Sequence, residues 1–261
     1  MKKIAIILTV LVLLLSLVSC LPVVKFDFPE EKTEESTDMI ELANRVSDEL
    51  LTSMVKVTTD KYNTGFFGNI TSSSSSSGSG VIFMESLGYY FVLTNYHVIE
   101  NEEEYKNTLY TVYDCYGTEY NAALIASDST YDLAVLRFSM EEPLGVVDFA
   151  EDAPSAESLI VSVGAPRGIM NSVTYGNVLD YKQVEVNPGD SEEMSDVSFA
   201  VGWHSSPIDH GSSGGGVFDE NLKLVGINYA TGYSDNGEFL CGLFIPINKV
   251  TEFLKKYEII S

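Results

Sequence analysis

The sequence is poor in Lys and Arg, which bind nucleic acids, and in His and Cys, which bind transition metals. Its 261 residues contain only 15 lysines and arginines against 38 aspartates and glutamates, and only three histidines and three cysteines. The formal net charge of −23 argues against a nucleic-acid partner, because neutralising phosphates requires Lys and Arg. No Cys-x-x-Cys or Cys/His spacing typical of a metal site occurs. We therefore expect no nucleic acid, no metal and no organic cofactor.

The sequence also lacks an apolar run long enough to cross a membrane comfortably. The apolar stretch 4–18 follows Met-Lys-Lys and is shorter than the roughly 20 residues that a spanning helix needs. A basic start, a short apolar run and small residues are typical of a secretory signal. The end of this stretch, LVSC, resembles the bacterial lipobox, in which the cysteine, here Cys20, is acylated and becomes the first mature residue. An ordinary signal peptide with an incidental cysteine is the alternative.

These features predict how the N-terminal part is organised. We expect a lipoprotein signal over 1–19, an acidic tether over 20–37, and a folded domain over 38–261. The protein is then expected on the extracytoplasmic face of a bacterial cell envelope, held to the membrane by its lipid. The two later cysteines, Cys115 and Cys241, are expected to be free thiols, with a disulfide as the alternative in an oxidising compartment.

The rest of the chain reads as a mainly β protein. Apolar residues at helical spacing predict one amphipathic helix over 38–53, with Ser36, Thr37 or Asp38 as its N-cap. From residue 54, about a dozen short runs rich in β-branched and aromatic residues favour a sandwich or a pair of barrels. A C-terminal helix is expected over 247–259. The run TSSSSSSGSG at 71–80 has no apolar anchor and is predicted to be a solvated loop.

Three segments carry residues suited to nucleophilic catalysis. His97 ends an apolar strand in YYFVLTNYHVIE, Asp132 begins another in YDLAVLRF, and Ser213 lies in HGSSGGGVF. A serine hydroxyl is a weak nucleophile until an imidazole accepts its proton, and the imidazole needs a carboxylate to fix its tautomer. Glycines around the serine allow a tight turn that can aim two backbone N–H groups at an oxyanion. Asp128 is the less favoured alternative to Asp132.

At these segments the chain resembles the trypsin-like serine proteases of the HtrA (Deg) type. Besides the three motifs, GSGVIF, VSVGAPRGIMNSVTYGNVLDY and IPINKVTEFL resemble further blocks of the family in the same order, over roughly residues 40–258. The resemblance implies an all-β fold of two six-stranded β-barrels, about 54–150 and 151–247, with an N-terminal and a C-terminal helix. It implies a serine endopeptidase that acts on unfolded or misfolded proteins and peptides.

The resemblance also assigns roles to individual residues. In the GxSGG pattern the nucleophile precedes the glycine pair, which selects Ser213 rather than Ser212. His97 would be the general base and then the general acid, and Asp132 would orient it. Backbone N–H groups of Gly211 and Ser213 would form the oxyanion hole. The residues expected to bind substrate are Pro207, Ile227, Asn228 and Tyr229, and the uncharged Pro207 and Asn228 favour a small or medium apolar residue before the scissile bond.

Some features depart from the family pattern. Ser212 carries no charge, which excludes activation by pairing with a new N-terminus, and Tyr96 is bulkier than the usual residue before the histidine. No PDZ domain is expected after the closing helix, so the regulation and the trimer typical of the family do not carry over, although an oligomer stays possible. The competing function is a catalytically silent surface lipoprotein that acts as a binding or chaperone module.

Overall fold

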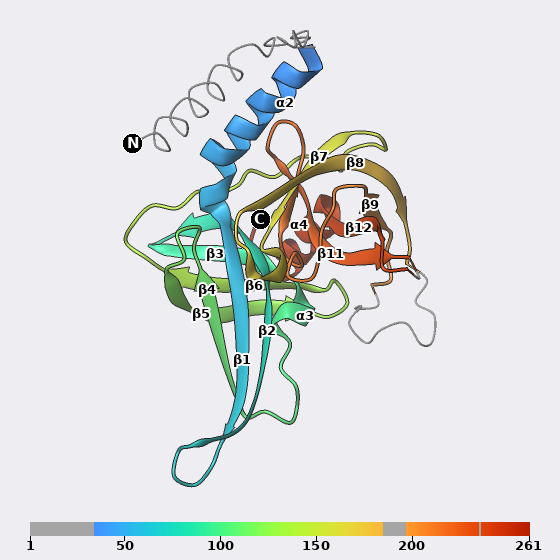
Figure 1. Ribbon diagram of the computed structural model, residues 1–261. Coiled ribbons are helices and arrows are strands. Elements are labelled where there is room, and N and C mark those ends of the chain that lie inside the picture. Colours follow the sequence, from blue (N-terminus) through green and yellow to red (C-terminus); the bar gives the residue numbers. More distant parts are fainter. Residues whose placement is uncertain (1–33, 185–196, 235) are drawn as a thin grey trace, which may run out of the picture. The chain divides into compact units, whose positions relative to one another are not determined.

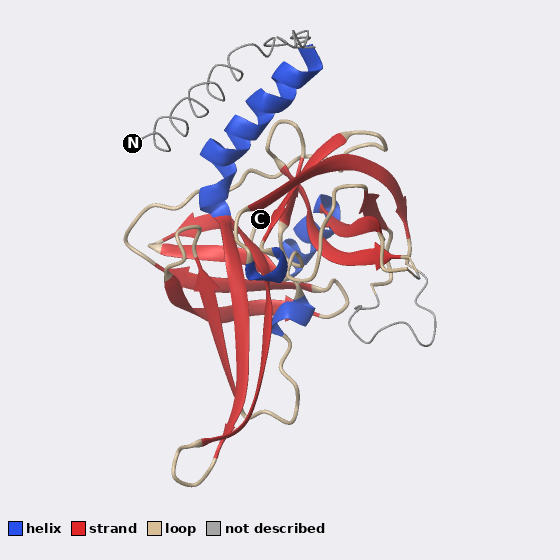
Figure 2. Ribbon diagram, viewed as in Figure 1, coloured by secondary structure: helices blue, strands red, loops and turns tan. Residues whose placement is uncertain are grey.

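The computed structural model describes residues 34–184, 197–234 and 236–261, and its strands form two closed barrels (Figure 1). Each barrel has six antiparallel strands, so the all-β, two-barrel architecture that the resemblance implied is confirmed. Figure 2 shows that strands predominate and that helices are few. Residues 40–261 form one compact unit. The predicted signal and most of the predicted tether lie outside the described residues.

The first barrel has the strand order β1-β2-β3-β6-β5-β4. Its strands are β1 Met54–Thr64, β2 Ile70–Ser86, β3 Tyr89–Thr94, β4 Asn107–Tyr113, β5 Glu119–Asp128 and β6 Leu133–Ser139. The second barrel has the order β10-β11-β12-β9-β8-β7. Its strands are β7 Leu159–Gly164, β8 Ser172–Lys182, β9 Val201–His204, β10 Gly216–Phe218, β11 Leu224–Tyr233 and β12 Phe239–Pro246.

The helices lie mostly where the sequence places them. They are α2 Glu34–Arg45, a π turn Val46–Leu50, 3₁₀ turns Leu51–Ser53 and Pro166–Gly168, α3 Tyr96–Ile99 and α4 Ile247–Lys256. The N-terminal helix begins earlier than predicted, so Ser36, Thr37 and Asp38 lie inside α2 and the predicted N-cap is wrong. Among the described residues, no helix is long and apolar enough to cross a membrane.

The prediction of a solvated loop at 71–80 is wrong, because this serine-rich run belongs to β2. The strand pairs with β1 from Met54↔Val81 to Thr64↔Ile70, and the register shifts only near the hairpin end. Figure 1 shows the two strands running side by side as a long hairpin. The run forms a strand because β1 offers a ladder of backbone groups, and those hydrogen bonds do not depend on an apolar side chain.

Both barrels share one large apolar core. Its fully buried members come from strands of the first barrel, such as Leu93 and Val135, and of the second, such as Phe218 and Leu224. Helix α4 adds Val250, Phe253 and Leu254, and the N-terminal helical segment adds Leu42, Val46 and Leu50. This continuous packing fixes the two barrels against each other, which matters because the site described below takes residues from both.

A buried carboxylate ties the first barrel to helix α4. Asp128 accepts hydrogen bonds from Lys256 Nζ at 2.7 Å, from the Tyr257 hydroxyl at 3.1 Å and from the Thr130 hydroxyl at 2.7 Å. Burial by itself would raise the pKa of Asp128, but these hydrogen bonds outweigh it and lower the pKa to about 2. Folding therefore favours the ionised form of Asp128. Its hydrogen bonds make it part of the contact with helix α4 rather than the partner of His97.

We expect Lys256→Met to lower the free energy of unfolding at pH 7, because the substitution leaves the buried carboxylate of Asp128 without its charged partner. Since the folded pKa of Asp128 lies below its usual value, this stabilisation is complete above about pH 4 and is lost as the pH falls towards 2. Urea unfolding of both proteins at several pH values between 3 and 7 measures it. A difference that grew on acidification would contradict the assignment.

Candidate active site

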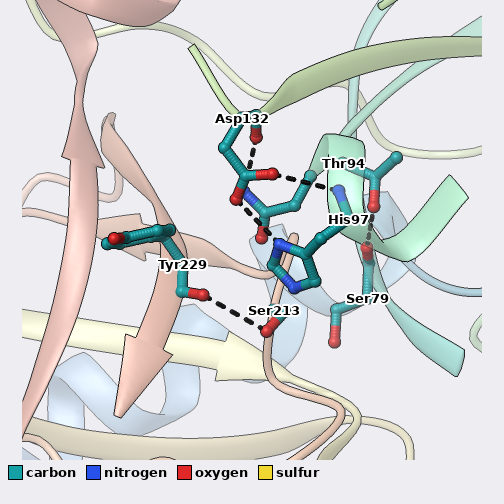
Figure 3. A network of polar contacts seen from close by, with 7 residues as sticks. Ser79, Thr94, His97, Asp132, Ser213 and Tyr229 are labelled. Carbon is teal, nitrogen blue, oxygen red and sulfur yellow. Dashed lines mark hydrogen bonds and ion pairs between the residues drawn. The ribbon is translucent and has the colours of Figure 1, made fainter. Parts of the chain in front are cut away.

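A cleft of about 1060 Å³ takes its lining from both barrels. The first barrel contributes Tyr96, His97 and the serines 74–77 of β2. The second contributes Gly211 and Ser213 from the loop before β10, and Tyr229, Ala230 and Thr231 from β11. His97, Asp132 and Ser213, which are far apart in the sequence, are thereby brought to one place (Figure 3).

His97 is held by Asp132 through two hydrogen bonds. Its Nδ1 lies 2.8 Å from Oδ2 of Asp132, and its backbone N–H donates to Oδ1 at 3.0 Å. The carboxylate is fully buried, whereas a quarter of the imidazole is exposed in the cleft. An ionised carboxylate at Nδ1 keeps the proton on that nitrogen, so Nε2 is free to accept a proton from elsewhere.

The turn before β6 places Asp132 in this position. Asp132 adopts a left-handed conformation with φ of 51°, which is uncommon outside glycine although Asp and Asn tolerate it best. Asn95, which precedes α3, donates from Nδ2 to the Asp132 carbonyl at 2.9 Å and is itself fully buried. The segments that carry His97 and Asp132 are thus held together by hydrogen bonds of both backbone and side chains.

Of the two adjacent serines, only Ser213 faces the cleft. Figure 3 shows its hydroxyl beside the imidazole of His97, and Oγ lies 3.5 Å from the Tyr229 carbonyl oxygen. The side chain of Ser212 is buried on the other side of the loop, where its Oγ accepts a hydrogen bond from Asp209 N at 3.2 Å. The tertiary structure therefore gives the two adjacent hydroxyl groups different surroundings, with that of Ser213 in the cleft and that of Ser212 buried.

The backbone N–H groups of Gly211 and Ser213 point away from the hydrogen bonds that hold this loop. Arg167 N donates to the His210 carbonyl at 2.7 Å, so the next N–H, that of Gly211, points the opposite way. Gly215 N donates to the Ser212 carbonyl at 2.9 Å. The Ser213 N–H belongs to the same trans peptide as that carbonyl and therefore points away from Gly215 N. Within the described part of the chain, neither N–H has a hydrogen-bond acceptor.

Glycine is required at two positions of this loop. Gly211 has φ of 92° and a Cβ there would lie 2.7 Å from the Ala165 carbonyl oxygen. Gly214 has φ of 84°, and a Cβ there would overlap the Ser79 carbonyl oxygen. The glycines therefore allow both the turn and the close approach of β2 to the loop.

Ser79 of β2 holds the loop of Ser213 from the opposite barrel. Its hydroxyl donates to the Gly211 carbonyl at 2.7 Å and accepts from Ala165 N at 2.8 Å. Its backbone N–H donates to the Ser213 carbonyl at 2.7 Å. Sequence reasoning missed this residue because it lies in the serine-rich run, although the GSG that precedes the apolar part of the strand was a usable signal.

We expect Ser79→Ala to lower kcat by roughly 10- to 100-fold with little change in KM, because the Gly211 peptide loses the bond that orients it. Two buried backbone groups also lose a partner, which should cost about 1 to 3 kcal/mol of stability. Ser86→Ala, on the exposed end of the same strand, is the matched control. Equal losses in kcat and in thermal stability for both variants would refute a positioning role for Ser79.

The residues predicted to bind substrate are only partly brought to the cleft. Tyr229 lines it, whereas Ile227 and Asn228 are fully buried and Pro207 lines a separate small cavity. Asn228 donates from Nδ2 to the Ser162 hydroxyl at 2.6 Å, and its Oδ1 lies 3.2 Å from Nε2 of His204. The pairing of β11 with β12 shifts register between Asn228 and Ala230, so the simple alternation of side chains is interrupted at Tyr229.

The other two histidines lie near the site without joining the His97 pair. His204 is fully buried, and burial lowers its pKa to about 4, so it is neutral at physiological pH. His210 lines the cleft next to Gly211. Cys115 and Cys241 are free thiols, as expected, with Cys241 buried. In the regions that the structure describes, no cluster of three His, Cys, Asp or Glu side chains could hold a metal ion.

Comparison with known proteins agrees with this geometry. The trypsin-like peptidase domain family matches residues 78–227, which include all three residues of the constellation. The chain is 32% identical over 234 residues to the serine protease Do-like HtrA of Bacillus subtilis, covering 85% of this chain and 48% of that protein. It is 30% identical over 174 residues to the periplasmic serine endoprotease DegP of Escherichia coli, covering 66% of this chain and 34% of that protein.

A further relative is a probable periplasmic serine endoprotease of Bartonella henselae, described as DegP-like. It is 34% identical over 170 residues, which cover 65% of this chain and 31% of that protein. The chain thus spans about half the length, or less, of these relatives. The match to the family extends over more than half of the chain and includes parts of both barrels. The chain therefore belongs to the trypsin-like peptidase domain family.

Proposed function

We propose that this protein is a serine endopeptidase of the HtrA type, with His97, Asp132 and Ser213 as its catalytic residues. The observation that supports this most is the buried carboxylate of Asp132 on Nδ1 of His97, with the Ser213 hydroxyl beside the same ring in an open cleft. The relatives are named serine proteases, which agrees with that chemistry. The geometry favours a working enzyme over a silent binding module, because no member of the constellation is missing.

The first half of the reaction forms an acyl-enzyme. Ser213 Oγ attacks the carbonyl carbon of the scissile peptide bond while His97 Nε2 accepts its proton. The carbonyl oxygen becomes an oxyanion, which receives hydrogen bonds from the N–H groups of Gly211 and Ser213. The C–N bond then breaks, His97 returns the proton to the leaving amine, and the acyl group stays on Ser213 as an ester.

The second half of the reaction hydrolyses the acyl-enzyme and restores the free Ser213 hydroxyl. A water molecule attacks the ester carbonyl, and His97 accepts its proton. When the ester C–O bond breaks, that proton passes to Ser213 Oγ and the new carboxylate departs. Asp132 stays ionised throughout and stabilises the imidazolium form of His97. The substrates are proteins or peptides with an accessible extended segment, since the site is an open cleft rather than an enclosed pocket.

A fluorophosphonate probe tests this function directly. The probe reacts with a serine only when a neighbouring base activates its hydroxyl, so Ser213 should be labelled and Ser212 should not. Peptide mass spectrometry of the labelled protein identifies the modified residue. An unlabelled protein that still binds unfolded polypeptides would favour the binding or chaperone module instead.

We also propose that the mature protein begins at a lipid-modified Cys20 on the extracytoplasmic side of a bacterial membrane. Cys20 lies outside the described residues, and the proposal rests on the LVSC motif that follows the short apolar run. The Escherichia coli and Bartonella henselae relatives are named periplasmic, which is a compatible compartment. Intact-mass measurement of protein extracted from membranes should find an acylated Cys20. Soluble protein cut at another residue would argue against the anchor.

A further inference from the structure

The strand β2 leaves one of its edges without a neighbouring strand. It pairs with β1 from Ile70 to Val81, and it pairs with β3 only from Val81 onwards. Residues 70–80 of β2 therefore have β1 on one side only, and β3 has already ended at the other side. An open strand edge presents a row of backbone donors and acceptors that can pair with an extended polypeptide.

The contacts of Ser79 tell which backbone groups point to this open edge. Its N–H donates to the Ser213 carbonyl at 2.7 Å and its carbonyl accepts from Thr94 Oγ1 at 2.8 Å, both on the side away from β1. Backbone directions alternate along a strand, and the register with β1 continues without a shift to Asn63↔Ser72. The N–H and C=O groups of Ser77, Ser75 and Ser73 consequently point the same way as those of Ser79.

These groups are accessible. Ser73, Ser75 and Ser77 are exposed, and none of their backbone groups has a hydrogen-bond partner on that edge among the residues that the structure describes. Their side chains are small, so a second strand could approach closely. By contrast, the hydroxyl of Ser76 is turned inwards and donates to the Val98 carbonyl at 2.9 Å.

The open edge continues directly into the candidate active site. Ser74–Ser77 line the same cleft as His97 and Ser213, and the edge ends at Ser79, which is bonded to the Ser213 carbonyl. The lining of the cleft includes Tyr229–Thr231 of β11, here called the β11 arm, and Ser74–Ser77 of β2, here called the β2 arm. A polypeptide bound across Ser213 in extended form would follow both arms.

The β2 arm is bordered by acidic side chains. Glu100 and Glu102 line it, and Glu103 and Glu104 are exposed immediately after them. Lys61, which lines the cleft, is already bonded to Glu102 at 2.7 Å, and the exposed Lys106 follows Glu104 by two residues. Glu100 makes no ion pair with a basic side chain in the described ranges. The border therefore carries excess negative charge, which attracts Lys and Arg side chains.

We propose that the open edge of β2 at Ser73–Ser77 binds one flank of the polypeptide substrate as an added β-strand, and that this flank is preferred when it carries Lys or Arg. The inference rests on the proposed protease function and names the class of substrate, namely extended cationic segments several residues long. Backbone hydrogen bonds from the edge would bind any sequence in extended form, and the acidic border would select among sequences.

Peptide substrates of two lengths test the proposal. The short substrate contains only the residues nearest a cleavage site mapped in casein by mass spectrometry. The long ones add six residues with alternating Lys or alternating Glu, on the amino side in one series and on the carboxyl side in the other. We expect the Lys extension on one side to raise kcat/KM about tenfold or more over the short peptide, and the Glu extension on that side to give far less.

A proline variant then assigns the gain to the strand edge. Ser75→Pro removes the N–H that points to the open edge but no hydrogen bond to β1, and proline is tolerated at such edge positions. It should lower the ratio of kcat/KM for the long and short Lys peptides by roughly 5- to 20-fold. Ser75→Ala keeps the N–H and should lower that ratio far less. Glu100→Gln should reduce the preference for Lys over Glu, as should 0.5 M salt.

The outcomes separate this inference from the proposed function. Cleavage of the short peptide without a gain from either extension would overturn the inference and leave the protease function standing. A Ser75→Pro variant that is as stable as the parent, but whose ratio of kcat/KM for the long and short Lys peptides is unchanged, would overturn the inference as well. If no peptide is cleaved and Ser213 is not labelled by the probe, the protease function fails and the inference fails with it.

Discussion

The Ser213→Ala protein should hydrolyse casein with a kcat/KM lower by a factor on the order of 10⁴ to 10⁶, as is typical for loss of a catalytic nucleophile. Ser212→Ala should lose only about tenfold, the value of one hydrogen bond in the loop. The reason is where the side chains lie: Ser213 is in the cleft beside His97, whereas Ser212 is buried and bonded to Asp209 N at 3.2 Å.

The comparison needs both variants to be folded. Thermal unfolding and near-ultraviolet circular dichroism should show the same transition shape for both, with Ser212→Ala somewhat less stable because its hydroxyl is buried. The experiment then measures kcat and KM separately under identical conditions. An inactive Ser212→Ala beside an active Ser213→Ala would mean that the nucleophile has been placed one residue too far along the chain.

Asp132→Asn should lower kcat by about 10⁴-fold while the protein remains folded, the magnitude known for such a change in proteases with this arrangement. Asp132 now accepts from both Nδ1 and the backbone N–H of His97. An amide in its place can donate to Nδ1, which would move the imidazole proton to Nε2 and leave no acceptor for the Ser213 proton. It would also leave the imidazolium without a counter-charge.

Asp128→Asn is the matched control for this change. Both carboxylates are buried and four residues apart, but Asp128 binds Lys256 and Tyr257 rather than His97. Its substitution should reduce stability and leave most of the activity at 25 °C. Steady-state kinetics and unfolding curves of both variants distinguish a direct effect on the reaction from a loss of stability. Comparable losses of kcat in the two would show that the damage comes from the fold.

Most of the strand content and the candidate catalytic residues could be predicted from the amino-acid sequence. Twelve short runs of β-branched and aromatic residues predicted the strands, since side-chain patterning on a pleated surface is a local property. The histidine, aspartate and serine motifs each lie within a few residues of a turn. Their order, together with the resemblance to the protease family at the DLAVL and GxSGG motifs, pointed to His97, Asp132 and Ser213, which the structure brings together.

The role of the serine-rich run, by contrast, could not be predicted from its sequence. Ser73–Ser79 have no apolar pattern, and they form a strand because β1 and the Ser213 loop offer them backbone partners. The link from Ser79 to Gly211 joins residues 132 positions apart, and the link from Asp128 to Lys256 joins residues 128 apart. Such contacts depend on how the two barrels pack against each other. That packing depends on many core side chains together, so it cannot be predicted from any short stretch of sequence.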